Sequence, residues 1–277
     1  PVRSILKLKR PTDGEDTPNM LVDPNSSEIG PAVLIPTGTV FQLGGTPCDS
    51  ACPGHSATYN TLTDHWAVGP DVPKVGKQVG DSSDGPAVLL PNGNVLVQTS
   101  PIFAAPSHFF EYNGTKFVRV SEPDQAPDMS SYEGRMMSLP TGQVFWTSDQ
   151  GDIEIYTTTY KVNADWAPTI ASAPKKLVRG HANYNISGTR FNGLTQGNGY
   201  GDDAQSYTNY PLVRITNKGT GHVCYARTHD HSTMGINEAG DPTSTKFDVP
   251  GTCETGASTI EVIANGMASP KASATVS

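Results

Sequence analysis

A short motif that occurs three times constrains this chain more than any other feature. It reads GPAVLIPTGTV from Gly30, GPAVLLPNGNV from Gly85 and GRMMSLPTGQV from Gly134. Each copy has an apolar stretch, a Pro-x-Gly turn and a second apolar stretch, which is the pattern of a tight β-hairpin. The first part of the chain is therefore predicted to repeat one β-structured unit.

The spacing of the motif indicates what this unit builds. The turn prolines Pro36, Pro91 and Pro140 are separated by 55 and 49 residues, and each hairpin is followed by a second pair of strand-like segments. Four strands at a period near 50 residues are typical of a blade of a kelch-type β-propeller. In such a blade, we expect Tyr59 and Trp66 to pack against the adjacent blade.

The visible repeats account for about three blades, whereas a propeller normally needs at least four to close around its axis. Residues 1–29 could supply part of a preceding blade. The alternative, which we favour, is that the chain is the C-terminal part of a larger propeller, and its start at Pro1 suggests a processed or truncated product. The remaining blades would then come from a missing N-terminal part or from a companion chain, because an open edge exposes unpaired backbone.

The pattern changes from about Pro168 onward. Short strand-like segments such as PLVRITN, GHVCYART and STKFDVPG alternate with turns. About seven short strands in roughly 110 residues fit a small β-sandwich of the immunoglobulin type. The predicted fold class is therefore all-β, with a partial kelch-type propeller over residues 1–166 and an immunoglobulin-like sandwich over residues 167–277.

The four cysteines fall into two pairs. Cys48 and Cys52 lie in a turn-rich loop, and Cys224 and Cys253 lie in two strand-like segments. We predict a disulfide in each pair, and free thiols or a zinc site are the alternatives. Zinc is disfavoured because neither pair is accompanied by a second CxxC or a well-spaced histidine. Disulfides indicate an oxidising compartment, and hence a secreted or cell-surface protein.

Composition and short motifs narrow the possible partners. Three sequons, at Asn25, Asn113 and Asn185, are candidate glycosylation sites. A formal net charge of −8 argues against a nucleic-acid partner, since phosphate contacts require a basic face. The sequence contains no apolar run near the roughly 20 residues that span a bilayer, so no membrane span is predicted.

The order of the parts resembles that of galactose oxidase-like proteins, in which kelch-type blades precede a small immunoglobulin-like domain. SYEGRMMSLPTGQV is similar to a family segment with a Tyr-His pair before a Leu-Pro-x-Gly turn. PCDSAC resembles a small disulfide loop of the family, and VPGTCETGASTIEVIANGMASP resembles the closing strands of its C-terminal domain. The resemblance covers nearly the whole chain.

This resemblance also implies a copper site. Members hold copper with two histidines, an axial tyrosine and a tyrosine cross-linked to cysteine, and they oxidise an alcohol to an aldehyde with release of hydrogen peroxide. The resemblance places Tyr132 at the axial tyrosine and His229 at one histidine, while Glu133 stands at the other. The cross-linked pair belongs to earlier blades. Because copper(II) prefers imidazole in such a site, Glu133 argues against oxidase activity.

Two polar clusters are further candidate sites. His229 and His231 would face one side of a strand and could bind a divalent metal together with Tyr132 or Glu133. We favour a loop that plugs the propeller channel, and direct substrate contact is a third alternative. In GNGYGDDAQSYTNYPLVR, residues 197–214, the carboxylates of Asp202 and Asp203 could bind calcium, or the segment could be a structured loop at the interface of the two domains.

The leading functional prediction is a secreted, non-catalytic recognition or structural module that binds carbohydrate or a surface protein through its propeller loops. One alternative is a copper-dependent alcohol oxidase with Tyr132 and Glu133 in a site shared with missing blades. Another is an architectural subunit that docks a partner chain through its open blade edge. Enzymatic activity is not expected but stays open. We expect no cofactor, with copper and calcium as the open alternatives.

Overall fold

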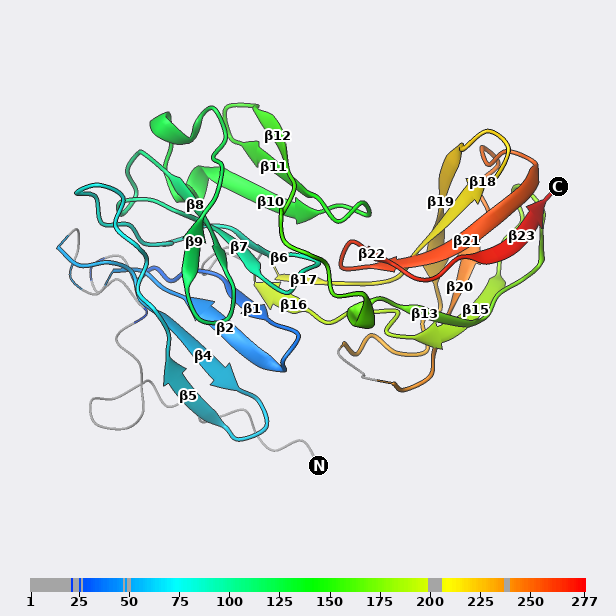
Figure 1. Cartoon of the computed structure of the whole chain (residues 1–277), viewed down its shortest axis with the longest axis horizontal. Helices are drawn as coiled ribbons and strands as arrows, with labels where there is room; N and C mark the ends of the chain where they lie inside the picture. Colours follow the sequence, from blue (N-terminus) through cyan, green and yellow to red (C-terminus); the bar gives the residue numbers. More distant parts are fainter. Residues whose placement is uncertain are drawn as a thin grey trace.

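The protein is all-β. The computed structural model describes residues 21, 25, 27–46, 48, 51–198, 206–236 and 240–277. Strands make up 42% of the structure and helices 4%, so the predicted fold class is confirmed at this level. Figure 1 shows an N-terminal part built from stacked sheets and a C-terminal part at the other end of the long axis.

The described strands of the N-terminal part form sheets A, B and C. Sheet A contains β1 (Ala32–Leu34), β2 (Thr39–Leu43), β4 (Ser56–Asn60) and β5 (His65–Val68). Sheet B contains β6 (Ala87–Leu89), β7 (Val95–Thr99), β8 (His108–Tyr112) and β9 (Phe117–Arg119). Sheet C contains β10 (Gly134–Ser138), β11 (Val144–Ser148) and β12 (Ile153–Tyr156).

Each copy of the sequence motif forms the predicted antiparallel hairpin, namely β1–β2, β6–β7 and β10–β11. The reason is the turn glycine, which follows the proline by two residues. Gly38, Gly93 and Gly142 have φ values of 81°, 86° and 83°, in a backbone region that glycine adopts without steric cost. The repeat in the sequence is therefore a repeat of one turn geometry.

The sheets lie face to face, with sheet B between sheets A and C (Figure 1). Apolar side chains of sheets A and B form one cluster, which includes Phe41 stacked on Tyr112 with ring centroids 4.1 Å apart. Side chains of sheets B and C form a second cluster around Leu96 and Val144. Every residue of β7 is buried because both faces of sheet B are covered, whereas β10 and β12 alternate between inner and exposed residues.

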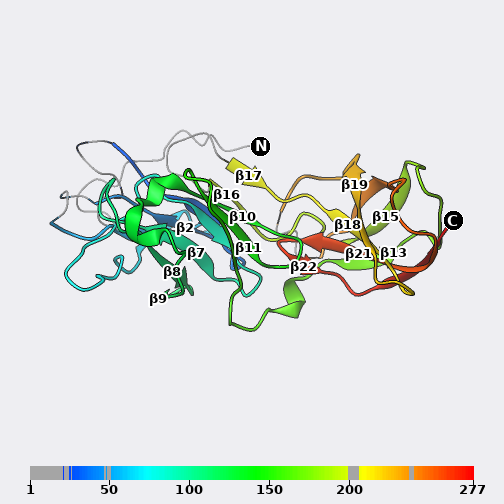
Figure 2. The ribbon, with the colours of Figure 1, turned by 90° about the horizontal axis from the view of Figure 1, so that it is seen from above.

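Two strands from later in the chain extend sheet A. β16 (Gln196–Asn198) pairs with β1, and β17 (Ser206–Thr208) pairs with β16. Figure 2 shows both strands beside the N-terminal part rather than within the C-terminal sheet. The boundary predicted after residue 166 is thus crossed by this pair, although the strands up to β12 do lie before it.

The remaining strands form the C-terminal sheet. Along this sheet the order is β13-β15-β20-β19-β18-β21-β23-β14, with β22 paired to β21. Their bounds are β13 Thr169–Ser172, β14 Lys176–Leu177, β15 Tyr184–Thr189, β18 Leu212–Asn217, β19 Val223–His229, β20 Thr243–Asp248, β21 Gly256–Ala264, β22 Met267–Ala268 and β23 Ala272–Val276. Its apolar core includes Ile186, Phe247 and Ile260.

Both predicted disulfides are present. Cys48 bonds to Cys52, and Cys224 bonds to Cys253, with Cα atoms 5.8 Å and 5.5 Å apart. Cys224 lies in β19 as predicted, but Cys253 lies in the loop before β21 rather than in a strand. The second bond therefore ties a loop to the sheet. Two disulfides suggest an oxidising, extracellular environment.

The helices are single 3₁₀ turns in the described part of the chain. They are η1 (Ala126–Asp128), η2 (Ser131–Glu133) and η3 (Ala164–Trp166). Among the described residues we find no helix with the length and apolar character needed to cross a membrane. Of the three turns, η2 bears most directly on function, because it carries Tyr132 and Glu133.

Candidate functional site

One end of sheets A, B and C gathers most of the long loops. Because antiparallel strands alternate in direction, the loops that follow β2, β7, β9 and β11 all lie at the end opposite the Pro-x-Gly turns. We call the described residues of these loops, 44–46, 48, 51–55, 100–107, 120–133 and 149–152, the distal loops. They carry Tyr132, Glu133 and the Cys48–Cys52 disulfide.

Two aromatic side chains from different distal loops meet at the surface. Phe103 and Tyr132 are 43% and 38% exposed, and their rings form an edge-to-face pair with centroids 6.1 Å apart. Phe103 has a φ of 49°, a conformation that is unfavourable for a bulky side chain. The loop therefore holds an aromatic ring outward at a cost in backbone energy, which is a feature more common at functional sites.

Glu133 has a local role beside this pair. Its carboxylate accepts a hydrogen bond from the Ser130 backbone N–H at 2.5 Å, and its carbonyl accepts one from the Asp149 N–H at 3.1 Å. The carboxylate thus closes the 3₁₀ turn that presents Tyr132. Arg135 adds a further contact by donating to the Tyr132 carbonyl at 2.7 Å.

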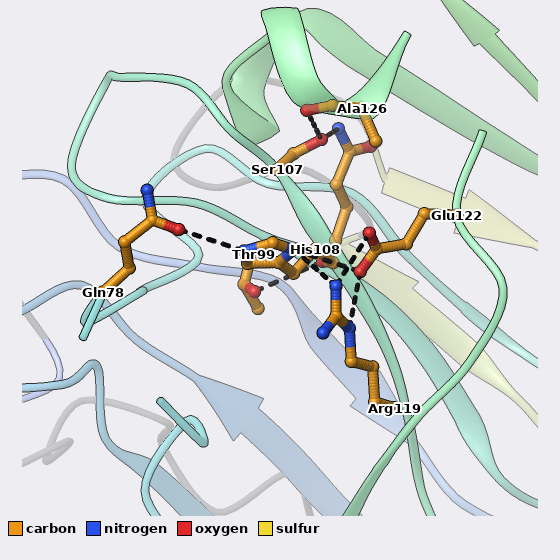
Figure 3. Close-up of polar contacts among 8 residues, drawn as sticks. Gln78, Thr99, Ser107, His108, Arg119, Glu122 and Ala126 are labelled. Atoms are coloured by element: carbon orange, nitrogen blue, oxygen red, sulfur yellow. Dashed lines mark hydrogen bonds and ion pairs between the residues drawn. The ribbon is translucent and has the colours of Figure 1, made fainter. Parts of the chain in front are cut away.

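A charged group lies at the start of β8 and the end of β9. Figure 3 shows His108, Arg119, Glu122 and Gln78 directed toward one another. The His108 Nδ1 is 3.0 Å from Glu122 Oε1, and Arg119 donates to both Glu122 oxygens, at 2.9 and 3.1 Å. On its other side, the His108 Nε2 is 3.3 Å from Gln78 Oε1. The imidazole is thus held between a carboxylate and an amide.

The electrostatics of this group favour an ionised Glu122. Burial raises the pKa of its carboxyl, but hydrogen bonds from Arg119 and His108, together with their charges, outweigh burial and leave the pKa lowered. No motif in the sequence points to this group. The close spacing of Arg119 and Glu122 is a weak signal, whereas the approach of His108 depends on the β8–β9 hairpin.

The second histidine cluster lies on the C-terminal sheet. The His229 Nε2 is 3.0 Å from Asp248 Oδ1, and its Nδ1 is 3.4 Å from Asp230 Oδ2. Lys246 donates to the same Asp230 oxygen at 2.9 Å. The His231 Nδ1 contacts the Thr245 hydroxyl at 2.9 Å. These side chains therefore hold one another within one sheet.

Titration behaviour in this cluster follows these contacts. Hydrogen bonds from the Asn183 backbone and then from His229 lower the pKa of Asp248, and Lys246 lowers the pKa of Asp230. Desolvation, together with repulsion from His229, lowers the pKa of His231. The lowered pKa values favour the ionised form of both carboxylates, which pair with Lys246 and His229.

The structure does not bring Tyr132 and Glu133 together with His229 and His231. η2 precedes β10, whose other end leads to the Pro-x-Gly turn, where Gly142 lies against Gly266 of the C-terminal part. η2 thus lies at the distal end of β10, away from the turn that meets Gly266. β16–β17 is the segment from later in the chain that pairs with sheet A, whereas the predicted plug of the propeller channel is the loop that carries His229 and His231.

The copper hypothesis gains no support from these positions. Glu133 is engaged with Ser130, and His229 lies between two carboxylates of another sheet. Within the described ranges, no group of three or more His, Cys, Asp or Glu side chains is placed to hold a metal ion. Asp202 and Asp203, the candidate calcium ligands, lie outside the described residues.

A pocket of about 370 Å³ lies between sheets B and C on one side and residues from the later part of the chain on the other. Its described lining is uncharged and includes Met136, Met137, Leu212 and Tyr210. This lining offers apolar contact and a few amides or hydroxyls, and it does not offer a set of metal ligands.

The three sequon asparagines are all exposed. Asn25 lies in a turn, Asn113 in the β8–β9 turn and Asn185 on β15. The Asn113 side-chain oxygen accepts hydrogen bonds from the Thr115 and Lys116 N–H groups, which closes that turn. Exposure makes the three sites accessible, and their glycosylation stays a prediction.

Comparisons with known proteins add no relative to this description. A scan against protein-family models and a search of curated proteins find no match for the chain.

Proposed function

We propose that the chain is an extracellular, non-catalytic module of the galactose oxidase-like kind that recognises carbohydrate through its distal loops. In this proposal sheets A, B and C are blades of a kelch-type propeller, and the C-terminal sheet is an immunoglobulin-like domain. The remaining blades come from a missing N-terminal part or from a companion chain. The motif repeat and the stacking of the sheets support the propeller, and the two disulfides support the location.

The observation that carries the recognition function is the exposed aromatic pair of Phe103 and Tyr132. Aromatic faces suit sugar rings, because they cover the C–H surface of the ring while its hydroxyl groups reach polar neighbours. Two polar side chains lie near the pair: Arg135 contacts the Tyr132 backbone, and Glu133 follows Tyr132 in the sequence. A surface protein is the other partner class considered, and it is tested alongside.

A printed oligosaccharide array with galactose, glucose, mannose and N-acetylglucosamine termini tests the proposal. The wild-type chain should retain a subset of these glycans, and titration calorimetry should then give an affinity for the strongest one. Phe103→Ala and Tyr132→Ala should each weaken that affinity by about tenfold or more, since central aromatic residues contribute most of the energy of small interfaces.

Tyr225→Ala is the matched control. Tyr225 is also about two-fifths exposed, at 40%, but lies on β19 of the C-terminal sheet, so its removal should leave glycan affinity unchanged. An array that retains no glycan would contradict the proposal, as would equal losses in all three variants. Capture of extracellular proteins without any glycan binding would shift the assignment to a protein partner.

A further inference from the structure

The repeat allows the burial of matched positions to be compared from sheet to sheet. We call the face that each sheet directs at the next sheet in sequence its forward face, and the opposite one its backward face. In the first two strands of each sheet, the forward face carries matched pairs at fixed distances from the turn proline: Val33 and Phe41, Val88 and Leu96, and Met137 and Phe145.

Burial at the first of these positions differs sharply in sheet C. Val33 and Val88 are 0% and 5% exposed because the next sheet covers them, whereas Met137 is 57% exposed. Met137, Phe145 and Ile155 are in register across β10, β11 and β12, and Ile155 is 49% exposed. The forward face of sheet C is thus an apolar row that lacks the cover seen in the two preceding repeats.

The backward face of sheet A shows the complementary pattern. Val95 of sheet B and Val144 of sheet C are 0% and 1% exposed, because the preceding sheet packs on them. The matched residue of sheet A, Val40, is only half-buried. Val40 is in register with Tyr59, which pairs with Trp66, and both aromatic residues are half-buried too. These are the two aromatics that the repeat pattern predicts to pack against an adjacent blade.

We propose that these two faces meet between two copies of this chain, with the forward face of sheet C in one copy packed on the backward face of sheet A in the other. The chain carries both halves of an interface that it already forms twice internally. Two copies of the described part contribute six sheets, which lies within the usual range of about four to eight for a closed propeller. A head-to-tail contact of this kind closes into a ring when its rotation permits.

This inference rests on the proposed propeller. The repeat pattern predicts an open edge as the exposed feature, whereas sheet C exposes the apolar face that a following sheet would cover. Both faces are mainly apolar, so their burial against each other should drive the association by the hydrophobic effect, and a ligand is not required.

Sedimentation of the full chain at tens of micromolar provides the first test. The wild type should have twice the mass of the 29.3 kDa chain. Ile155→Asp places a charge in the proposed contact and should weaken the association by about tenfold or more. Val223→Asp is the matched control, because Val223 is a 43% exposed strand residue of the C-terminal sheet. It should leave the mass unchanged.

A cross-linking experiment tests which faces meet. All four cysteines of the chain are in disulfides, so an introduced cysteine has no thiol partner within its own copy. Val40→Cys and Phe145→Cys occupy positions matched to Val144 and Leu96, which share one apolar cluster. A mixture of the two variants should give a mixed disulfide dimer, and neither variant alone should do so.

Three results would overturn the inference. The wild type could sediment as a monomer, which would assign the faces to blades of another source. Ile155→Asp could behave as Val223→Asp does, or Phe145→Cys could cross-link to itself. Glycan binding by a monomeric chain would leave the proposed recognition function intact while removing the second copy, so the two proposals fail separately.

Discussion

At the scale of single residues, the informative side chains are those whose contacts are set by the fold rather than by their neighbours in sequence. The family resemblance suggests Tyr132 as a copper ligand, yet the structure presents it as half of an exposed aromatic pair. Phe103 and His108 could not be predicted as site residues, because a lone Phe or His carries no motif. Each meets a side chain from a separate segment: Phe103 meets Tyr132 before β10, and His108 meets Gln78 between β5 and β6.

The charged group around His108 gives a prediction with a defined pH dependence. The pKa of Glu122 is lowered in the folded protein, so its contacts stabilise the fold above the unfolded-state pKa of about 4.3. That contribution is lost as the pH falls through the lowered value. Glu122→Gln should therefore reduce the free energy of unfolding by about 0.5–1 kcal/mol at pH 7, and the difference should vanish in acid.

Chemical denaturation of both proteins between pH 7 and pH 3 measures this difference. Asp128→Asn, which neutralises an exposed carboxylate of η1, serves as the control and should follow the wild-type curve throughout. A gap between Glu122→Gln and wild type that stays constant over this range would contradict the ion-pair explanation.

At the scale of elements, the hairpins were the most predictable part of the fold. Their signal is local, because a Pro-x-Gly turn between two apolar stretches specifies its own geometry. The addition of β16 and β17 to sheet A was not predictable in the same way, since β16 and its partner β1 lie far apart in the sequence. The prediction of a structured loop over residues 197–214 therefore missed β16 and β17, whereas β18 begins within the predicted strand segment PLVRITN.

The Pro-x-Gly turn of sheet C provides a test at this scale. Gly142 has a φ of 83°, and a Cβ there would lie 3.0 Å from the Gly266 carbonyl oxygen, so Gly142→Ala adds a contact strain to the conformational one. Gly114 has a φ of 92°, and a Cβ there would lie more than 4 Å from any heavy atom outside its chain neighbours. Gly114→Ala should therefore show only the conformational cost, about 1–2 kcal/mol.

Thermal unfolding of the two variants measures the difference, and Gly142→Ala should have the lower midpoint. Equal midpoints would show that the turn of sheet C does not press on the β21–β22 turn in solution.

At the scale of the whole molecule, the two disulfides differ in how much of the chain they constrain. Cys224 and Cys253 are 29 residues apart, whereas Cys48 and Cys52 are 4 residues apart. A closed loop restricts the unfolded chain more when it is longer, which gives about 3.6 kcal/mol for the first bond and about 2 kcal/mol for the second. The first bond also ties β19 into the core of the C-terminal part.

Paired Cys→Ser variants should therefore differ in stability. The Cys224→Ser/Cys253→Ser protein should unfold at the lower denaturant concentration, and the Cys48→Ser/Cys52→Ser protein should stay closer to wild type. The opposite order would show that the short distal loop, and not the C-terminal sheet, limits the stability of the molecule.

The β1–β16 pairing also has a consequence for the order in which the molecule folds. Sheets B and C are built from hairpins whose strands follow one another closely, so they can form soon after they are synthesised. Sheet A cannot gain β16 until the chain has been made to Asn198, more than 160 residues after β1. During synthesis, the edge of β1 that faces away from β2 therefore stays without its partner strand. We expect the pairing of β16 with β1 to be the slow, late step of folding.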